Sequence, residues 1–518
     1  MSSSKVNIKP LKRVLVANRG EIAVRIIRAL RELSIESVAL YSDADRESLH
    51  VHLADYAIRI TGDTSLEQTY LDHNKVIQAA LMSNCDGLHP GYGFLSENEA
   101  FVSSLEQQTT IRFIGPSAHA TRELGDKVRA KELAKKVGIP VLGGSSQALS
   151  SLSELKEIST RIGLPIVLKA SAGGGGRGMR VVTKLEDLSR CYTEAKREAL
   201  SCFGEDGVFC EKYLLKPRHI EFQTLFDDYG GAIHLYERDC SVQRRYQKII
   251  EEAPSPVLNH RLRTEMGVMA INLGLSAGYS GVATVEFICD GHDYYFMEMN
   301  TRIQVEHPVT EMITGIDLVK ESVRVAEGRP LSLKQEDIVI RGHAIELRVN
   351  AEDPCSDFAP SFGRIDRVQW PSGPFTRVDS HIFSGYQVPD IYDSLLGKII
   401  VWGHDRKEAI LRARRALKET EISPLETTIS FHETLLAHQD FVENRISTTY
   451  LGDHKDELLK LLDHDVSQLD QEEVRMMCAV LVEHEWQKKS VLPPQKKADA
   501  PDTENSNDFL WQSSEEDW

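Results

Sequence analysis

One stretch of sequence decides the fold, Leu164-Pro-Ile-Val-Leu-Lys-Ala-Ser-Ala-Gly-Gly-Gly-Gly-Arg-Gly-Met-Arg-Val-Val182. The apolar residues on either side of the glycines predict two strands joined as a hairpin flap. Residues 173–178 fit the G-x-G-x-x-G pattern of dinucleotide sites, but that pattern requires a following helix, and the Gly-Lys-Ser/Thr of a P-loop is missing. The bare amides of such a flap can close over phosphates, whereas a flexible linker is the simpler alternative.

The sequence around this flap divides into segments of different pattern. Short apolar runs at 14–17 and 37–41 alternate with helical spacing over 21–33, which predicts a parallel, doubly wound sheet. From the flap onwards the strands become hairpin-like. We therefore predict a mixed α/β and α+β fold with a Rossmann-like unit at 1–125, an α+β unit at 126–340, a further α+β unit at 341–452 and a helical, then disordered, acidic tail at 453–518.

Charge and composition narrow the classes of function. The 518 residues carry a net charge of −17, and 17 acidic against 7 basic residues fall in 453–518. An acidic chain is poorly suited to nucleic acid or anionic lipid, although it can still hold a basic pocket for a phosphorylated ligand. Eight cysteines without a Cys-x-x-Cys pair, no apolar signal region and no membrane-spanning run predict a cytoplasmic protein without a membrane partner.

The tail is predicted to contain two helices before it becomes disordered. Leucines at 458, 459, 461 and 462 predict the first helix, and apolar residues from 474 to 482 predict the second. From residue 490 onwards Pro, Lys, Asp, Ser and Asn dominate, which predicts disorder. Two tryptophans within 509–518 favour a docking peptide about as much as a frayed end without function.

A second hairpin offers metal ligands. Residues 284–289 and 294–300 are predicted strands joined by a turn through 290–292. A loop of odd length puts Glu286 and Glu298 on one face of the ladder, opposite or diagonal, and Asn300 shares that face. Two carboxylates and an amide oxygen are hard ligands suited to Mg²⁺ beside substrate phosphates. For an isolated hairpin, a solvated outer face would be the plainer interpretation.

Polar residues continue from this hairpin at a period of two, at positions 298, 300, 302, 304 and 306, interleaved with mostly apolar residues. Arg302 can hold a planar oxyanion with two parallel donors, Gln304 adds a neutral contact, and Glu306 can act as a base. Such a row fits a small planar anion beside a metal-bound phosphate better than a solvated surface.

Other cations are candidates for phosphate or anion contacts. Lys127, His219 and Lys248 are each compatible with an ordinary surface position. Lys169 differs because it interrupts an apolar strand and would need a partner if buried. Arg348 is likewise flanked by apolar residues on a predicted strand.

Four motifs resemble the biotin carboxylase subunit of bacterial biotin-dependent carboxylases, which belongs to the ATP-grasp enzymes. They are Val16-Ala-Asn-Arg-Gly-Glu-Ile-Ala23, His89-Pro-Gly-Tyr-Gly-Phe-Leu-Ser-Glu-Asn98, Arg238-Asp-Cys-Ser-Val-Gln-Arg-Arg245 and Glu298-Met-Asn-Thr-Arg-Ile-Gln-Val-Glu-His-Pro308. The resemblance covers about 11–451 and implies a mobile lid near 142–213. It implies that carboxyphosphate is made from ATP and bicarbonate with Mg²⁺ or Mn²⁺, and that biotin on a separate carrier is then carboxylated, as in acetyl-CoA carboxylase and fatty acid biosynthesis.

The resemblance also implies roles for individual residues. The nucleotide would be bound by Lys127, Lys169, Gly174, Gly175, Gly176, Glu211, Lys212, Leu214, His219 and Gln243. The metal would be bound by Glu286 and Glu298, with Asn300 close by. Bicarbonate would be held by Lys248, Arg302, Gln304 and Val305. Glu306 would deprotonate bicarbonate and Arg348 would stabilise the biotin enolate, so that the catalytic set is Glu306, Arg348, Arg302 and Lys248.

Two positions depart from the family pattern, and two parts are missing. Ala172 stands where members usually carry glycine, and Tyr246 replaces a common histidine near the nucleotide. No Met-Lys-Met segment and no carboxyltransferase unit are present, so a biotin carboxyl carrier protein and a carboxyltransferase subunit are the expected partners. The missing transferase would choose the final acceptor, such as acetyl-CoA, propionyl-CoA or pyruvate, and family members often form homodimers.

Two alternatives remain at this stage. A different ATP-grasp ligase would share the flap and the metal pair but would not need Gln304, Glu306 and Arg348 together. A non-catalytic assembly subunit would work through its tail. Deleting 453–518 separates the assembly subunit from the carboxylase, because the enzyme would keep turnover of free biotin whereas a scaffold would lose its function.

Overall fold

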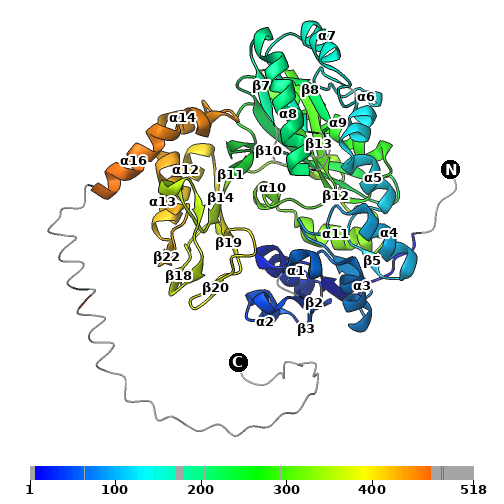
Figure 1. Cartoon of the computed structure of the whole chain (residues 1–518). Helices are drawn as coiled ribbons and strands as arrows, with labels where there is room; N and C mark the ends of the chain where they lie inside the picture. Colours follow the sequence, from blue (N-terminus) through cyan, green and yellow to red (C-terminus); the bar gives the residue numbers. More distant parts are fainter. Residues whose placement is uncertain are drawn as a thin grey trace.

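The computed structural model describes residues 6–467, apart from 63–64, 146, 171–178, 204–205 and 292, together with residues 480 and 482. The predicted second tail helix, except at 480 and 482, and the disorder predicted after residue 490 lie outside the described residues. Four groups of elements make up the described chain: a parallel sheet, a large antiparallel sheet, a small separate sheet and C-terminal helices (Figure 1). Among these residues, no helix combines the length and apolar character that crossing a bilayer requires.

The N-terminal unit is a parallel sheet in the order β3-β2-β1-β4-β5, as the alternating pattern predicts. Its strands are β1 (Arg13–Val16), β2 (Glu36–Tyr41), β3 (Tyr56–Arg59), β4 (Gly87–His89) and β5 (Arg112–Phe113). The connecting helices are α1 (Gly20–Glu32), α2 (Leu49–Leu53), α3 (His73–Met82) and α4 (Glu99–Gln108). Helix α1 packs on the sheet because its apolar residues recur on one face, and Ile22, Ile26 and Leu30 are buried.

An antiparallel sheet in the order β13-β12-β9-β10-β11-β14-β21-β19 forms the centre of the molecule. Its strands are β9 (Arg218–Phe226), β10 (Ala232–Arg244), β11 (Gln247–Ala253), β12 (Gly281–Asp290), β13 (Asp293–Asn300), β14 (His343–Asn350), β19 (Thr376–Ser380) and β21 (Leu395–Gly403). Strand β11 pairs with β14, with Ile250 opposite Leu347. The sheet therefore continues without a break across the segment boundary predicted at 340.

A separate sheet in the order β7-β6-β8 carries the glycine stretch. Strands β6 (Ile166–Ala170) and β7 (Arg180–Val182) confirm the two strands predicted around the glycines, and β8 (Val208–Lys212) pairs with the other edge of β6. Helices α7 (Leu152–Ile162) and α8 (Leu188–Phe203) cover this sheet at the top of Figure 1. The layer, called the lid below, has its own apolar core, which includes Leu155, Leu168 and Cys210.

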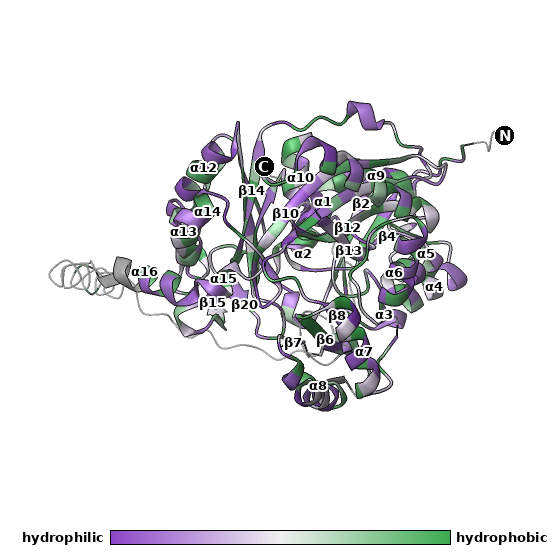
Figure 2. Ribbon diagram, turned by 90° about the horizontal axis from the view of Figure 1, so that it is seen from above, coloured by the Kyte–Doolittle hydropathy of each residue, from purple (hydrophilic) through white to green (hydrophobic). Residues whose placement is uncertain are grey.

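The C-terminal helices pack on the end of the central sheet. They are α12 (Arg406–Lys418), α13 (Ile429–Ala437), α14 (Gln439–Val442), α15 (Tyr450–Asp453) and α16 (Lys455–Ser467). Helix α12 lies at the periphery and is mostly hydrophilic in Figure 2, while Ala409, Ala413 and Leu417 are buried on its inner face. Helix α16 confirms the first predicted tail helix. Helix α16 packs against α13, and Leu458 of α16 is buried in the same core as Leu435 of α13.

The remaining elements connect these units. The helices are α5 (Ala118–Gly125), α6 (Lys127–Lys136), α9 (His260–Ser276), α10 (His307–Thr314) and α11 (Leu318–Ala326). The short strands are β15 (Glu352–Asp353), β16 (Ala359–Pro360), β17 (Gly363–Arg364), β18 (Arg367–Gln369), β20 (Gln387–Val388) and β22 (Glu421–Ser423). Single 3₁₀ turns occur at Asp43–Asp45, Leu66–Gln68, Leu185–Asp187, Gln335–Asp337 and Pro354–Ser356.

The packing of α16 predicts that Leu458→Ala lowers the stability of the C-terminal unit by about 2–4 kcal/mol, because it leaves a cavity in the core. Leu461→Ala on the same helix is the matched control. That side chain is 47% exposed, so its truncation should change stability by about 0.5 kcal/mol or less. Denaturant unfolding of both variants measures the difference. Equal stabilities would show that α16 is not held by this core. To test the tail without removing α16 from this core, the chain should be truncated after Ser467.

Candidate active site

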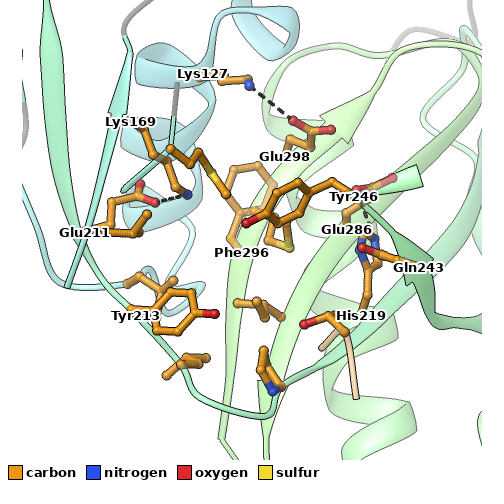
Figure 3. Close-up of a pocket in the computed structure, with 18 of the residues that line it drawn as sticks. Lys127, Lys169, Glu211, Tyr213, His219, Gln243, Tyr246, Glu286, Phe296 and Glu298 are labelled. Carbon is orange, nitrogen blue, oxygen red and sulfur yellow. Dashed lines mark hydrogen bonds and ion pairs between the residues drawn. The ribbon is translucent and has the colours of Figure 1, made fainter. Parts of the chain in front are cut away.

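A cavity of about 2170 Å³ lies between the lid, the β12–β13 hairpin and the C-terminal helices. The lid contributes Lys169 and Glu211, the hairpin contributes Glu286 and Glu298, and β14 contributes Arg348. All the described residues that the sequence singles out for a site line this cavity, and Leu214 and Val305 are among them. Figure 3 shows one part of the cavity, with Lys127 directed to Glu298 of the hairpin and Lys169 to Glu211. Gly174, Gly175 and Gly176 lie outside the described residues.

On the lid side, two lysines share one carboxylate. Glu211 and Lys169 lie on neighbouring strands, and the Lys169 ammonium is 2.5 Å from the Glu211 carboxylate. Lys131, on α6, pairs with the other oxygen of Glu211. Burial and the positive charges of neighbouring lysines lower the pKa of Lys169 and of Lys131 to about 8. Positive charge is thus in excess here, because one carboxylate does not balance two ammonium groups, and a bound anion would stabilise the charged form of both lysines.

Lys212 follows Glu211 but makes different contacts. Its ammonium donates to the carbonyl oxygens of Gly163 and Leu164, at 3.2 and 2.9 Å. The Lys212 side chain lines the cavity, but its ammonium group is already hydrogen-bonded to backbone oxygens of the lid.

The two carboxylates of the hairpin share one face as predicted, but the predicted odd turn is wrong: Asp290 pairs with Asp293, and a register shift between Glu286 and Phe287 restores the facing. Glu286 is directly opposite Glu298 in the ladder, and Asn300 donates from its side-chain amide to Glu286 at 2.9 Å. His219 Nε2 lies 3.0 Å from the other oxygen of Glu286, and His219 Nδ1 contacts the Gln243 amide at 2.9 Å. These contacts fix the Glu286 carboxylate at the bottom of the cavity.

The electrostatics of this pair fit a hard divalent cation. Burial and the negative charge of Glu286 raise the pKa of Glu298, whose nearest cation is the Lys127 ammonium at 3.8 Å. The Glu298 side chain is 38% exposed, so its oxygens are accessible from the cavity. A divalent cation between the two carboxylates would relieve their repulsion, and oxygen ligands of this kind suit Mg²⁺.

The polar row beyond the hairpin does not continue as a strand. Strand β13 ends at Asn300, and 301–306 form an irregular turn that leads into α10, which has a proline in its first turn. The period-two strand is therefore wrong beyond Asn300, because a proline at a helix start favours a turn and a helix there. The turn nevertheless brings Gln304 back to the hairpin, where its amide donates to Glu286 at 2.7 Å.

Arg302 also lies in this turn and is held from two sides. Its guanidinium donates to Glu97 at 3.0 Å and to the side-chain oxygen of Asn300 at 3.1 Å. The neighbouring Val305 carbonyl accepts a hydrogen bond of 2.6 Å from the fully buried Lys398. These contacts give the turn a fixed shape without regular secondary structure.

The Lys248 ammonium is the centre of the site. It lies 2.5 Å from Glu221, 3.1 Å from Glu286 and 2.5 Å from Glu306. Burial alone would lower the pKa of Lys248, but the three carboxylates outweigh burial and hold it well above its ordinary value. Burial likewise would raise the pKa of Glu306, and Lys248 together with Arg348 holds it far below its ordinary value. Both groups are therefore charged.

Arg348 links a carboxylate of the neighbouring strand β11 to one in the turn before α10. Its guanidinium donates to Glu251 at 2.6 Å and to Glu306 at 3.0 Å. Burial raises the pKa of Glu251 to about 7, although Arg348 opposes that change. The two carboxylates thus hold the guanidinium in position. Arg348 also lines the cavity.

Several charged residues of the site are not identified from the sequence. They are Glu221, Glu251, Glu97, Lys131 and Arg238. Arg238 is fully buried and donates to Glu221 at 2.5 Å and to Gln304 at 2.6 Å. A charged side chain inside a predicted strand, as in His219-Ile-Glu-Phe222, is the sequence feature that could have identified such residues. A buried charge needs a partner and therefore indicates a charged neighbour.

The fold and the site define an ATP-dependent carboxylase of the ATP-grasp type. Family models match nearly the whole described chain: the biotin carboxylase N-terminal domain at 10–121, the carbamoyl-phosphate synthase L chain ATP-binding domain at 126–334 and the biotin carboxylase C-terminal domain at 346–453. The chain therefore belongs to the biotin carboxylase family.

Individual relatives agree with this assignment. The chain is 50% identical over 440 residues to the biotin carboxylase of Nostoc sp., covering 85% of this chain and 98% of the relative. It is 49% identical over 443 residues to biotin carboxylase 1 of Bacillus subtilis, with 85% and 98% covered.

Solved structures show the same architecture. The biotin carboxylase domain dimer of Hydrogenobacter thermophilus 2-oxoglutarate carboxylase, in complex with MgADP, ADP and bicarbonate, is 46% identical with a TM-score of 0.83, covering 87% of this chain and 99% of that one. The biotin carboxylase of Campylobacter jejuni is 44% identical with a TM-score of 0.82, covering 86% and 99%.

The lysine pair on the lid side predicts an unusual titration. Lys169 should lose its proton near pH 8, so it is charged below that pH and neutral above it. Lys131→Gln removes a neighbouring positive charge and should raise the pKa of Lys169. Competitive amine labelling across a pH series, read by mass spectrometry, gives the pKa of each lysine.

Lys135→Gln is the control for this experiment, because Lys135 is exposed on the same helix. It should leave the titration of Lys169 nearly unchanged. A Lys169 pKa at the ordinary value of about 10.4 in the unaltered chain would contradict the described effect of burial and of the neighbouring positive charges.

Proposed function

We propose that the chain carboxylates biotin on a separate carrier protein, using ATP and bicarbonate through carboxyphosphate, as the first half-reaction of a multisubunit carboxylase. One observation carries this proposal. Lys248, Arg348 and Glu306 meet on the wall of the cavity that also holds the carboxylate pair of the hairpin. A small anion, a base and a metal-bound phosphate are the groups that this reaction must bring together.

The nucleotide is proposed to lie between the lid and the hairpin. Its phosphates would contact Lys127 and Lys169, whose ammonium groups face the cavity, with His219 and Gln243 on the opposite wall. Its base would lie along the lid beside Glu211, Lys212 and Leu214. Since the ammonium of Lys212 is bound to backbone oxygens, we assign that residue a contact through its backbone or its apolar stem. The glycines 174–176 would cover the phosphates with their amides.

The metal is proposed to be Mg²⁺ or Mn²⁺, held by Glu286 and Glu298 with Asn300 close by. When bound, such an ion neutralises phosphate charge and polarises the terminal phosphoryl group. The residues of this chain supply the rest: His219 and Asn300 hold Glu286 in place, and Lys127 adds a positive charge at the mouth of the pair.

Bicarbonate is proposed to bind at Lys248, Arg302, Gln304 and the backbone of Val305, with Glu306 as the base. In the ligand-free arrangement Glu306 is a weak base, because Lys248 and Arg348 stabilise its ionised form. Bicarbonate would compete for the charge of Lys248. Each contact that turns from Glu306 to the substrate would raise the basicity of Glu306, so binding of the anion would itself prepare the base.

Arg348 is proposed to stabilise the biotin enolate. It stays charged because Glu251 and Glu306 hold its guanidinium, and a fixed cation is effective where negative charge develops in a closed site. A closing lid would protect carboxyphosphate from water.

The partners follow from the half-reaction. We propose a biotin carboxyl carrier protein and a carboxyltransferase subunit as partners, a homodimer as the assembly, and the cytoplasm as the compartment. The dimeric structure of the Hydrogenobacter thermophilus domain supports the homodimer.

The proposed roles predict the activity of two variants. The unaltered chain should hydrolyse ATP only when bicarbonate is present, and free biotin should increase the rate. Glu306→Gln and Arg348→Ala should each lower biotin carboxylation by roughly 100-fold or more, because each removes a group that acts in the transition state. A coupled ADP assay with and without biotin measures both quantities.

Glu336→Gln and Arg364→Ala are matched controls, because both side chains are largely exposed and remote from the cavity lining. They should keep the unaltered rate. ATP hydrolysis that ignores bicarbonate would favour a different ATP-grasp ligase. Near-normal carboxylation by either cavity variant, with the controls unchanged, would refute the assigned role.

A further inference from the structure

Two imidazoles and a carboxylate converge where α14, α15 and α16 meet, away from the proposed catalytic groups. His438 Nε2 lies 3.4 Å from one oxygen of Glu457, and His454 Nδ1 lies 3.0 Å from the other. One ligand atom from each of these residues falls within 4.8 Å of the others. The two other clusters of this kind among the described residues contain Glu221 and belong to the active site.

The spacing of these atoms matches the coordination of a small transition-metal ion. A tetrahedral zinc ion with bonds of about 2.0–2.2 Å keeps its ligand atoms roughly 3.3–3.5 Å apart. The nitrogen–oxygen distances of 3.4 and 3.0 Å, each to a different oxygen of Glu457, are near that spacing, and the carboxylate would turn one oxygen toward both imidazoles when an ion binds. Two neutral imidazoles and one carboxylate are also a donor set that zinc accepts, with the fourth position left to solvent.

Both histidines already have the outer hydrogen-bond partners that metal-binding histidines use. The Tyr450 hydroxyl is 2.7 Å from His438 Nδ1, which leaves Nε2 directed to Glu457. His454 Nε2 lies 3.4 Å from Asp440, which leaves Nδ1 on the side of Glu457. Such partners fix the tautomer and the orientation of a ligating ring. Asp440 is itself held by Arg445, at 2.5 Å.

We propose that His438, His454 and Glu457 bind one divalent transition-metal ion of the imidazole-preferring class, for which Zn²⁺ is the probe. The site differs in kind from the oxygen-rich pair of the hairpin, which suits hard cations. His438 is nearly buried, whereas Glu457 is 58% exposed, so the ion would enter from solvent on the side of α16.

The proposed ion would fasten the start of α16 to the end of α13. Leu451, Lys455 and Leu459, from α15 and α16, line the large cavity, so the ion would also hold one wall of that cavity. Lys455 already pairs with Asp357 across this wall, at 2.8 Å. Binding at the cluster and the shape of the nucleotide cavity would therefore be linked through a short rigid segment.

The test is a count of bound zinc on the full chain. Equilibrium dialysis against Zn²⁺, with excess Mg²⁺ and ADP present, should show one zinc ion fewer per chain for His454→Gln and for Glu457→Gln than for the unaltered protein. Tyr450→Phe keeps the packing but removes the hydroxyl partner of His438, and should weaken zinc binding by roughly 10–100-fold. Zinc should also raise the melting temperature of the unaltered chain more than that of His454→Gln.

His52→Gln is the matched control, because that histidine is exposed and has a single carboxylate, Glu47, at 3.8 Å. It should bind as much zinc as the unaltered chain. Glu457 is exposed enough for its glutamine variant to fold, which circular dichroism checks. Equal zinc counts and affinities for the unaltered chain, His454→Gln and Glu457→Gln would overturn the proposal, and the cluster would then be an ion-pair network only.

Discussion

The active site depends on one buried ammonium group. Lys248 pairs with Glu221, Glu286 and Glu306, which come from β9, β12 and the turn before α10. Bringing several carboxylates into a protein interior is costly, and each added charge needs a partner with good geometry. Lys248 supplies that partner for all three at once. The position of the turn, and with it the proposed base, is therefore set by an electrostatic requirement more than by regular secondary structure.

The central sheet gives this charge network its rigidity. Lys248 lies on β11 and Arg348 on the neighbouring β14, so the pairing of these strands fixes the separation of the two cations. Glu251 holds Arg348 across the same pair of strands. The groups proposed for bicarbonate and for biotin thus share one continuous hydrogen-bonded frame, although they come from segments that the sequence separates.

The sequence predicts regular elements well and the network poorly. The facing of Glu286 and Glu298 is predicted correctly but for the wrong reason, because the turn pairs Asp290 with Asp293 and a register shift beside Glu286, which the sequence does not reveal, brings Glu298 opposite it. The end of the strand at Asn300 is not predictable, because the alternation of polar and apolar residues continues through the turn that leads to Pro308 and α10. Glu221 and Glu251 are not predicted as site residues, because the function of a charged residue inside a strand can be inferred only when its partners on the neighbouring strands are known. The residue types alone suggest the metal pair and the parts of Arg302 and Glu306, whereas the roles expected of the other residues come from the family resemblance.

The core of the lid has a mechanical consequence. Lys169 and Glu211 sit on adjacent strands of one small sheet, so a rigid swing of that sheet carries acid and amine together and leaves their pairing intact. Lys131 belongs to α6, outside the sheet, and the same swing would pull it away from Glu211. If the sheet moved in this way, Glu211 would keep one of its two cationic partners, and its ion pair with Lys131 would oppose the movement.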